Sequence, residues 1–395
     1  MTNSIEQVDI LIVGSGPSGT STALHLVRDN PTWAERIIVL DKAVHPREKL
    51  CGGGVTHLGQ NILAQLGLPF DVPNFEVKEA RLVFEDQSYS FFGDPVFRIT
   101  RRDQFDHWLV KTAEKLGVRV RQGEAVTGIE IQPDHVVVET EKATFHAQAV
   151  VAADGSRSFV RRRLKWPDES RVARLVEVLT PENSNLQPEF RDGVAIFDFT
   201  HMKDGLQGYY WDFPSYVEGQ PFMNRGLFDS RVRTERPKAD LKEALRQSMA
   251  ERDRDLDAYK LKGHPIRWWS RDARFAMSRV ILVGDAAGAD PFLGEGISFA
   301  LGYGEVAAAA LADAFERRDF SFDTYRDRLL AHGLFQHLDL RTRLARLSYV
   351  RRYPWVMRLG WRIADQVVRR TRWGNPRYVP AQTPDFRLLD TASTS

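Results

Sequence analysis

Three glycines near the N-terminus, Gly14, Gly16 and Gly19, have the spacing G-x-G-x-x-G that suits a phosphate-binding turn. The first glycine permits a tight turn, and the second allows the backbone to approach a pyrophosphate closely. The third lets the following helix pack against the preceding strand. A helix that begins here would direct its free N–H groups and its positive dipole end toward phosphates. The spacing therefore predicts a dinucleotide site.

The segments that flank these glycines supply the elements that such a site needs. Residues 8–13 form a largely apolar run that predicts a buried parallel strand, and a helical stretch continues to about Arg28. A second predicted strand, 37–40, ends on Asp41, whose carboxylate is placed to accept hydrogen bonds from a ribose. Because strand, turn, helix and acid follow one another, they favour dinucleotide binding over an ordinary tight turn.

Two later apolar strands also end on an acid and a glycine, Asp154 with Gly155 and Gly284 with Asp285. In an open α/β sheet, ligands bind at the edge formed by the carboxyl ends of the strands. Either acid alone could be a helix N-cap. Together they favour FAD over NAD, because FAD is long and needs contacts well beyond its ADP half.

A further glycine cluster follows a cysteine, in Cys51-Gly52-Gly53. Successive glycines allow the backbone to pass very close to a flat or bulky group, although they also suit a flexible loop. Cys51 is the only cysteine. A lone cysteine is commonly a small buried apolar residue, but the neighbouring glycines make Cys51 a candidate catalytic residue. The aromatic stretch 209–213 is either sheet core or the wall of an apolar pocket.

The composition limits the class of protein. The chain has 395 residues, of which 43% are hydrophobic, so we expect about two closely associated domains with a sizeable core. We find no signal-peptide pattern and no run approaching the ~18 apolar residues of a membrane span. One cysteine excludes an intramolecular disulfide, so we predict a cytoplasmic protein. We predict no metal site and no nucleic-acid partner.

Positive charge is concentrated near the C-terminus. Residues 341–373 contain ten arginines and one acid, a charge of +9 in a chain whose net charge is +2, so the remainder carries −7. Apolar residues keep helical spacing on either side of Pro354, and tryptophans lie between the arginines. These helices could cover the substrate domain with their arginines in water. Alternatively, they could rest on an anionic membrane as a peripheral contact.

The order of predicted elements indicates an α/β fold. We expect a Rossmann-like FAD-binding domain, an inserted antiparallel-sheet substrate domain and C-terminal helices. The FAD-binding domain is predicted in three parts, 1–74, 100–171 and 272–334. The substrate domain is predicted in two, 75–99 and 172–271, before a C-terminal helical region, 335–395.

These motifs, in this order, resemble the FAD-dependent oxidoreductases with the p-hydroxybenzoate hydroxylase fold. The resemblance covers roughly residues 8–310 and is carried by GSGPSG with Asp41, Arg102-x-x-Phe105-Asp106, ADGSRS and GDAAGADPFLGEGI. Two segments resemble the geranylgeranyl reductase branch in particular. They are Lys49-Leu50-Cys51-Gly52-Gly53 and the pattern Y-x-W-x-F-P at Tyr209, Trp211, Phe213 and Pro214.

The resemblance implies where each part of FAD would bind. Asp41 would contact the adenosine ribose, Arg102 the phosphate region, and Asp285 the ribityl chain or pyrophosphate. Gly294, Glu295 and Gly296 would lie against the isoalloxazine ring, with the Cys51-Gly52-Gly53 loop on the other side. The helix beginning near Ile297 would direct its positive end at the ring and stabilise its anionic reduced form.

The resemblance also implies an apolar substrate pocket lined by Tyr209, Trp211 and Phe213. In the family, Y-x-W-x-F-P is followed by Gly-x-Gly, for which the nearest match is Gly226-Leu227-Phe228, three residues late. Phe228 therefore replaces the second glycine. We expect its ring to narrow the pocket, which argues against a substrate as large as a geranylgeranyl chain.

The favoured function is reduction of a C=C bond in a hydrophobic, isoprenoid-type substrate by reduced FAD. Water, Cys51 or Tyr209 would supply the proton. No second dinucleotide unit is visible in the sequence, so NADPH or NADH would bind transiently as electron donor, or another protein would donate.

Two other functions remain open. An aromatic hydroxylase or halogenase shares the FAD motifs, although the halogenase pattern W-x-W-x-I-P is missing and Trp268-Trp269 has the wrong spacing. A non-catalytic flavin or lipid carrier at a membrane is the third alternative.

Overall fold

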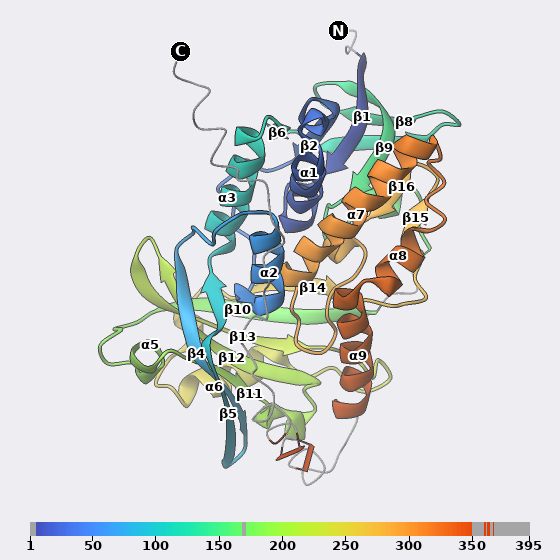
Figure 1. Ribbon diagram of the computed structural model, residues 1–395. Coiled ribbons are helices and arrows are strands. Elements are labelled where there is room, and N and C mark those ends of the chain that lie inside the picture. Colours follow the sequence, from blue (N-terminus) through green and yellow to red (C-terminus); the bar gives the residue numbers. More distant parts are fainter. Residues whose placement is uncertain (1–4, 168–170, 350–358, 361, 364–365, 367–395) are drawn as a thin grey trace, which may run out of the picture.

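The structure is a computed structural model that describes residues 5–167, 171–349, 359–360, 362–363 and 366. The part of the C-terminal region around Pro354 therefore lies outside the described residues. The tryptophans that lie between its arginines, Trp355, Trp361 and Trp373, are outside them too, as is the apolar residue Val367. Within the described chain there are two large sheets. In Figure 1 the first sheet lies above the second, and helices surround the first.

The first sheet is the predicted Rossmann-like core. Its central strands are parallel and run in the order β16-β9-β1-β2-β6. Their bounds are β1 Ile5–Val13, β2 Ile37–Asp41, β6 Arg119–Gln122, β9 Thr144–Ala152 and β16 Val280–Leu282. The antiparallel members are β7 Val126–Ile131, β8 Val136–Thr140 and β15 Ala276–Met277. The strand order reverses at β1, which creates the crevice where such sheets bind ligands.

Helices cover this sheet because its strands are apolar on both faces. The FAD-binding part contains α1 Pro17–Asp29, η1 Pro31–Arg36, α2 His57–Gln65, α3 Arg102–Lys115, α4 Phe159–Arg163, η4 Gly284–Ala286, α7 Ile297–Arg317 and α8 Tyr325–Ala331. The helix α7 packs against α1, and both are largely buried. It is long and apolar enough to cross a membrane, but 78% of its apolar window is buried inside the protein, as in a core helix.

The second sheet is the predicted substrate domain. Its order is β14-β10-β13-β12-β11-β4-β5-β3, and its pairs are antiparallel except β11 with β4. The strands are β3 Gly54–Thr56, β4 Asn74–Phe84, β5 Gln87–Thr100, β10 Val172–Pro181, β11 Val194–Asp198, β12 Gly208–Val217, β13 Gln220–Asp229 and β14 Lys262–Arg267. Around it lie α5 Pro188–Asp192, η2 Thr200–Asp204, α6 Leu241–Ala250 and η3 Leu256–Ala258.

The structure differs from the predicted boundaries at two places. The sequence predicts one helix from Asp240 to about Asp257, but α6 ends at Ala250, because Asp253 adopts a left-handed conformation (φ 53°) that a helix cannot continue. The strand β3 precedes the predicted start of the substrate domain, yet it pairs with β5 in the second sheet. The glycine loop before β3 therefore carries the chain from the first sheet to the second.

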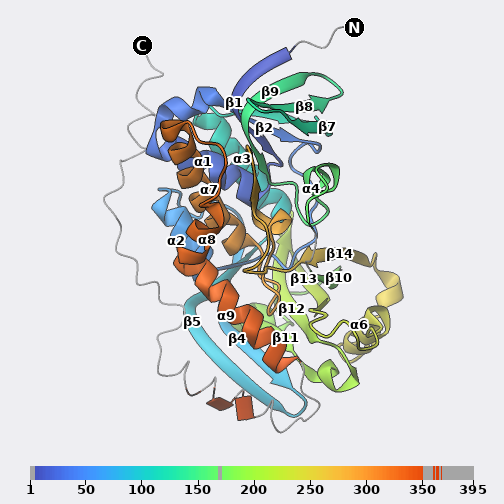
Figure 2. The ribbon, with the colours of Figure 1, turned by 90° about the vertical axis from the view of Figure 1, so that its right-hand side faces the viewer.

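The helix α9 (Gly333–Ser348) joins the two halves of the molecule (Figure 2). Near its start, Leu334, Phe335 and Leu338 pack into the hydrophobic core of the FAD-binding part. At its end, Ala345 and Tyr349 belong to the core of the second sheet. A single helix therefore contributes to both cores and spans the junction between them.

We predict that Gly304→Ala destabilises the protein. A Cβ at Gly304 would lie 2.4 Å from Ser21 Oγ and 2.6 Å from the Ser21 carbonyl carbon, so α1 and α7 would have to separate. We expect a loss of about 1–3 kcal/mol from overpacking, in spite of alanine's better helix propensity. The midpoint of unfolding in urea measures this loss of stability. Gly333→Ala is the control, because a Cβ there meets nothing within 4 Å. Equal midpoints for the two variants would contradict the prediction.

Candidate active site

A single cavity of about 980 Å³ runs from the first sheet to the second. This volume is at the upper end for ligand pockets. Almost all the predicted site residues line it: Gly14, Gly16, Asp41, Cys51, Gly52, Gly53, Arg102, Asp154, Gly155, Tyr209, Trp211, Phe213, Phe228, Asp285, Gly294, Glu295, Gly296 and Ile297. Segments far apart in the chain therefore meet at one site.

The two other predicted residues, Gly19 and Gly284, lie beside the cavity and serve packing. A Cβ at Gly19 would be 2.0 Å from the Gly14 carbonyl oxygen, and one at Gly284 would be 2.4 Å from Ser18 Oγ. Both glycines therefore let α1 approach the ends of the central strands, as expected for the third glycine of the motif.

Gly14 is where three strand ends converge. Its φ is +108°, and its N–H donates to the Leu40 carbonyl at 2.7 Å. A Cβ would lie 2.4 Å from the Ala153 carbonyl oxygen. The turn therefore requires glycine, and it leaves the start of α1 facing the cavity, where a phosphate would be favoured.

Asp41 is buried and held in the ionised state. Its carboxylate accepts hydrogen bonds from the Ser15 backbone N–H (2.9 Å), the Ser15 hydroxyl (2.6 Å) and the Ala43 N–H (2.9 Å). Burial alone would raise its pKa, but these hydrogen bonds and Arg47 outweigh burial and lower it. A fixed acceptor at this position suits a ribose hydroxyl.

The sequence left open whether Asp154 caps a helix or faces a ligand site. In the structure Asp154 does both, because it accepts a hydrogen bond from α4 and lines the cavity. One carboxylate oxygen accepts from the Val160 N–H at 3.0 Å, next to α4. The other, Oδ1, is buried with no hydrogen-bond partner among the described residues, and burial raises the pKa of the group. An orphaned acceptor on a cavity wall can bind a ligand hydroxyl or amide.

A group of cations lines the middle of the cavity. Arg102 forms two hydrogen bonds to Asp106, at 2.8 and 2.9 Å, and Arg47 contacts the same carboxylate at 3.2 Å. The Lys49 ammonium donates to His264 at 2.7 Å, and burial together with Lys49 lowers the pKa of His264 to about 4. Lys49 and His264 were not anticipated as site residues, yet their position suits a pyrophosphate.

The loop that contains Cys51 crosses one side of the cavity. Gly53 has φ +79°, and a Cβ there would lie 2.1 Å from the Thr100 carbonyl oxygen. A Cβ at Gly52 would be 3.1 Å from the Phe213 ring. The Gly53 N–H points at the Cys51 sulfur at 3.4 Å. These glycines therefore bring the backbone close to the aromatic wall and to any ligand between them.

Hydrogen bonds fix the second glycine loop, residues 290–296, along its length. The carboxylate of Asp290 accepts from the N–H groups of Phe292 (2.7 Å) and Leu293 (3.2 Å). The hydroxyl of Tyr349 donates to the Phe292 carbonyl at 2.6 Å, and that of Tyr209 donates to the Leu293 carbonyl. Gly296 caps α7, so Ile297 begins this helix as predicted.

Arg341 on α9 connects this loop to the C-terminal helix. Its guanidinium contacts Asp290 at 2.8 Å and Glu295 at 2.5 Å, and Thr56 donates to the other oxygen of Glu295 at 2.5 Å. Burial would raise the pKa of Glu295, but Arg341 and the hydrogen bonds from Ser298 and Thr56 together outweigh burial and lower it. The prediction that the arginines of residues 341–373 face water or a membrane is wrong for Arg341. Helical spacing could have predicted this position. Arg341 comes three residues after the buried Leu338, so the two side chains lie on the same face of α9.

Aromatic side chains form the wall at the second sheet. Phe213 packs against Phe97 and Phe197, with ring centroids 5.8 and 5.0 Å apart. Phe228 lies 5.7 Å from the Tyr209 ring, and a Cβ at Gly294 would be 3.0 Å from Phe228. Phe228 thus stands between the glycine loop and the apolar pocket. The pair Trp268-Trp269 is buried and does not line the cavity.

Comparison with known proteins identifies the family. Residues 7–333 match the sequence profile of the FAD binding domain family. The chain belongs to this family. The glycine turn, the buried acceptors and the cations described above fit an extended dinucleotide, and the protein is an FAD-dependent oxidoreductase.

Relatives and solved structures confirm the resemblance to geranylgeranyl reductases. The chain is 25% identical to digeranylgeranylglycerophospholipid reductase 2 of Methanosphaera stadtmanae over 81% of this chain and 82% of that one. It is 27% identical to menaquinone reductase of Mycobacterium tuberculosis, over 78% and 77% of the two chains.

Among solved structures, a geranylgeranyl bacteriochlorophyll reductase-like protein from Thermoplasma acidophilum has a TM-score of 0.74, 20% identity and coverage of 98% and 96%. A p-nitrophenol 4-monooxygenase from Pseudomonas putida has a TM-score of 0.69, 19% identity and coverage of 95% and 100%. This FAD-binding fold thus occurs in reductases and in oxygenases, and it confirms the predicted fold class.

We predict that Asp285→Ala weakens FAD binding. Ser156 donates to Asp285 at 3.3 Å, at the long end of the hydrogen-bond range, so the carboxylate retains capacity for a ligand hydroxyl. Losing an acceptor that a bound ligand would bury costs about 1–3 kcal/mol, roughly a tenfold to hundredfold rise in Kd, which quenching of flavin fluorescence measures. Asp134→Ala is the control, because this side chain is 85% exposed. Unchanged affinity in Asp285→Ala would contradict the assignment.

We predict that Arg341→Gln lowers both stability and FAD affinity. The substitution leaves Asp290 and Glu295 buried without their cation, which costs about 3–5 kcal/mol when one partner of a buried pair is removed. Thermal unfolding and FAD titration measure the two effects. The control is Arg343→Gln on the same helix, where the side chain is 68% exposed and we expect little change. Similar behaviour of the two variants would show that the buried pairs are dispensable.

Proposed function

We propose that this enzyme reduces C=C bonds in a hydrophobic, isoprenoid-type substrate. The observation that carries the proposal is the continuity of the cavity. Its glycine-lined part, with Gly52 and Gly294, opens directly onto the aromatic wall formed by Tyr209, Trp211 and Phe213. An apolar chain seated on this wall would lie beside the ring of bound FAD. Relatives named for reductase activity on a digeranylgeranylglycerophospholipid and on menaquinone support the same substrate class.

FAD, when bound and reduced, would supply a hydride to one carbon of the double bond, and the protein would have to bind the substrate, exclude water and supply a proton. The aromatic wall holds the substrate chain and excludes water. The N-terminus of α7 lies at the cavity and favours negative charge there. The glycine loops let both ligands approach without obstruction by side chains.

We propose Cys51 as the proton donor to the second carbon. Its thiol lines the cavity, whereas the Tyr209 hydroxyl is engaged with the Leu293 carbonyl. Burial raises the pKa of Tyr209, so this hydroxyl holds its proton. The Cys51 thiol would give its proton to the second carbon, so that with the hydride the double bond gains two hydrogens, and the resulting thiolate would take back a proton from water.

The electron donor and the route of the substrate are further proposals. The sequence contains one G-x-G-x-x-G unit, so we propose that NADPH or NADH binds transiently or that another protein donates electrons. On α9, Leu340 and Leu347 are 53% and 57% exposed, and Arg343 is exposed beside them. This face would suit peripheral contact with an anionic membrane that delivers an apolar substrate.

The test is a single-turnover reaction without oxygen. We expect the dithionite-reduced enzyme to be reoxidised by a polyprenyl compound, with loss of one double bond and gain of two hydrogens by mass spectrometry. A series of geranyl, farnesyl and geranylgeranyl compounds measures the effect of Phe228, which we expect to favour the shorter chains. If substrate changes only in air and gains an oxygen atom, the protein is an oxygenase.

A further inference from the structure

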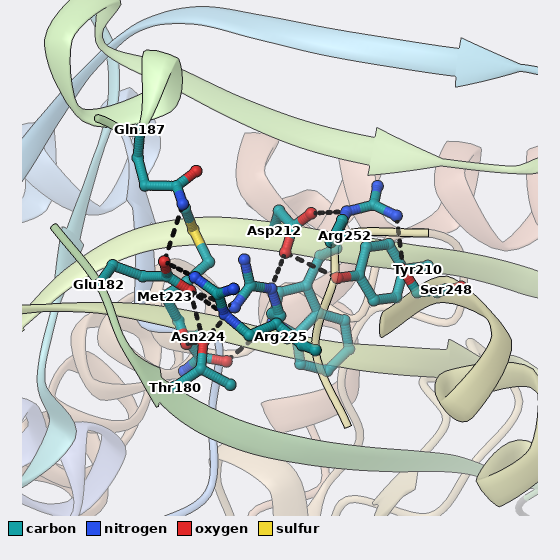
Figure 3. A network of polar contacts seen from close by, with 12 residues as sticks. Thr180, Glu182, Gln187, Tyr210, Asp212, Met223, Asn224, Arg225, Ser248 and Arg252 are labelled. Carbon is teal, nitrogen blue, oxygen red and sulfur yellow. Dashed lines mark hydrogen bonds and ion pairs between the residues drawn. The ribbon is translucent and has the colours of Figure 1, made fainter. Parts of the chain in front are cut away.

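A network of buried charges lies on one face of the second sheet (Figure 3). Arg225 contacts Asp212 at 2.8 Å and Glu182 at 2.5 Å, and these three residues do not line the cavity. On the opposite face of β13, the Asn224 amide donates to the Cys51 carbonyl at 3.0 Å. A slip of one residue would separate the charged pairs, so the network fixes the register that places Asn224.

The buried polar side chains around Asp41 differ from this network, because Asp41 itself lines the cavity. The Ser15 hydroxyl, which lies 2.6 Å from Asp41 Oδ2, also lies 2.8 Å from Nε2 of His45. All three residues are buried, with exposed fractions of 0% for Ser15, 7% for Asp41 and 6% for His45. They form a continuous hydrogen-bonded chain that ends at the cavity wall.

The direction of each hydrogen bond in this chain follows from what each group can donate. Asp41 is ionised and can only accept, so the Ser15 hydroxyl gives its one proton to Asp41. The His45 ring must then donate to the Ser15 oxygen, which places the ring proton on Nε2. The other ring nitrogen, Nδ1, is buried with no partner among the described residues. Burial lowers the pKa of His45, in agreement with a neutral ring that has no proton on Nδ1.

His45 is held in place by the protein on two further sides. Its backbone N–H donates to the side-chain oxygen of Gln122 at 2.7 Å, and Gln122 is paired with Asp41 between β6 and β2. Its ring stacks with the ring of His107 on α3, with centroids 6.4 Å apart and 27° between the ring planes. The imidazole is therefore fixed relative to Asp41 by the first sheet and α3.

We propose that His45 is a positioning residue for the adenosine ribose of FAD. Its Nε2–H occupies a lone pair of the Ser15 hydroxyl, so the hydroxyl keeps its proton directed at Asp41. The carboxylate, held by Ser15 and by the Ala43 N–H, then presents its remaining lone pairs to a ribose hydroxyl. An acceptor that is oriented before binding spares the complex the cost of ordering it. The inference rests on FAD binding through Asp41 and is independent of the proposed C=C reduction.

The test compares two amide substitutions of His45 in the full-length protein freed of flavin. The longer side chain in His45→Gln places an N–H near the position of Nε2, whereas the shorter one in His45→Asn does not reach Ser15. We measure Kd for FAD by flavin fluorescence and Ki for ADP as a competitor, because ADP carries the adenosine ribose without the flavin. We expect His45→Gln to bind both ligands like the wild type. We expect His45→Asn to bind both roughly twofold to tenfold more weakly, as for the loss of one hydrogen bond.

A double-mutant cycle with Ser15→Ala tests whether His45 acts through the hydroxyl. Ser15→Ala alone should weaken the binding of both ligands, and adding His45→Asn should weaken it no further.

The control is His25→Asn, at another buried histidine of the first domain. His25 is 1% exposed, donates from Nδ1 to the Ser21 carbonyl at 2.8 Å and does not line the cavity. We expect this variant to lose stability and to keep both affinities. Urea midpoints identify any variant that is misfolded. If His45→Asn does not fold, His45→Phe replaces it, because phenylalanine keeps the ring but lacks the donor.

Three outcomes would overturn the inference. Equal affinities of His45→Gln and His45→Asn would show that the N–H at Nε2 has no part in binding. A further loss of affinity when His45→Asn is added to Ser15→Ala would show that His45 acts by another route. A rise in Kd for FAD with an unchanged Ki for ADP would place the effect at the flavin and not at the ribose. Because these assays contain no substrate, their results stand whether or not the enzyme reduces C=C bonds.

Discussion

A loop made of glycines cannot hold itself in place, and this constraint governs the site. Residues 51–54 and 294–296 line the cavity with few side chains of their own, so they do little to fix their own positions. Their positions are set by partners elsewhere in the fold. Asn224 holds the first loop, and Arg341 holds the second through two buried carboxylates. The geometry of the site therefore depends on hydrogen bonds and ion pairs made by the second sheet and α9.

The two faces of the second sheet consequently have different roles. Along β12 and β13, residues on one face form the apolar wall and hold the Cys51 loop, while residues on the other face form the buried network around Arg225. The alternation of a β-strand separates these tasks cleanly. The same strands therefore line the apolar part of the cavity and hold the glycine loop that borders its other part, so one rigid element shapes both.

The sequence predicts site residues well where a local motif marks them. Gly14, Asp41 and Asp285 lie at or just after the ends of strands, so the strand–turn–helix pattern predicts their place at the sheet edge. Asn224 and Arg341 carry no such signal. Asn224 reaches a carbonyl 173 residues earlier in the chain, and that contact exists only once the two sheets are placed together. Arg341 stands at the start of an arginine-rich run, and only the packing of α9 separates it from its exposed neighbours.

The position of α9 also has a consequence for protein synthesis. On the ribosome, the strands and glycine turns of the first sheet emerge before α9, and Arg341 emerges only after the whole family domain, residues 7–333, has been made. Until then, Asp290 and Glu295 lack the cation that allows them to be buried. A nascent chain ending before α9 would therefore have a nearly complete nucleotide fold but an unfixed loop at 290–296. The last wall of the cavity would become fixed only after α9 has been made.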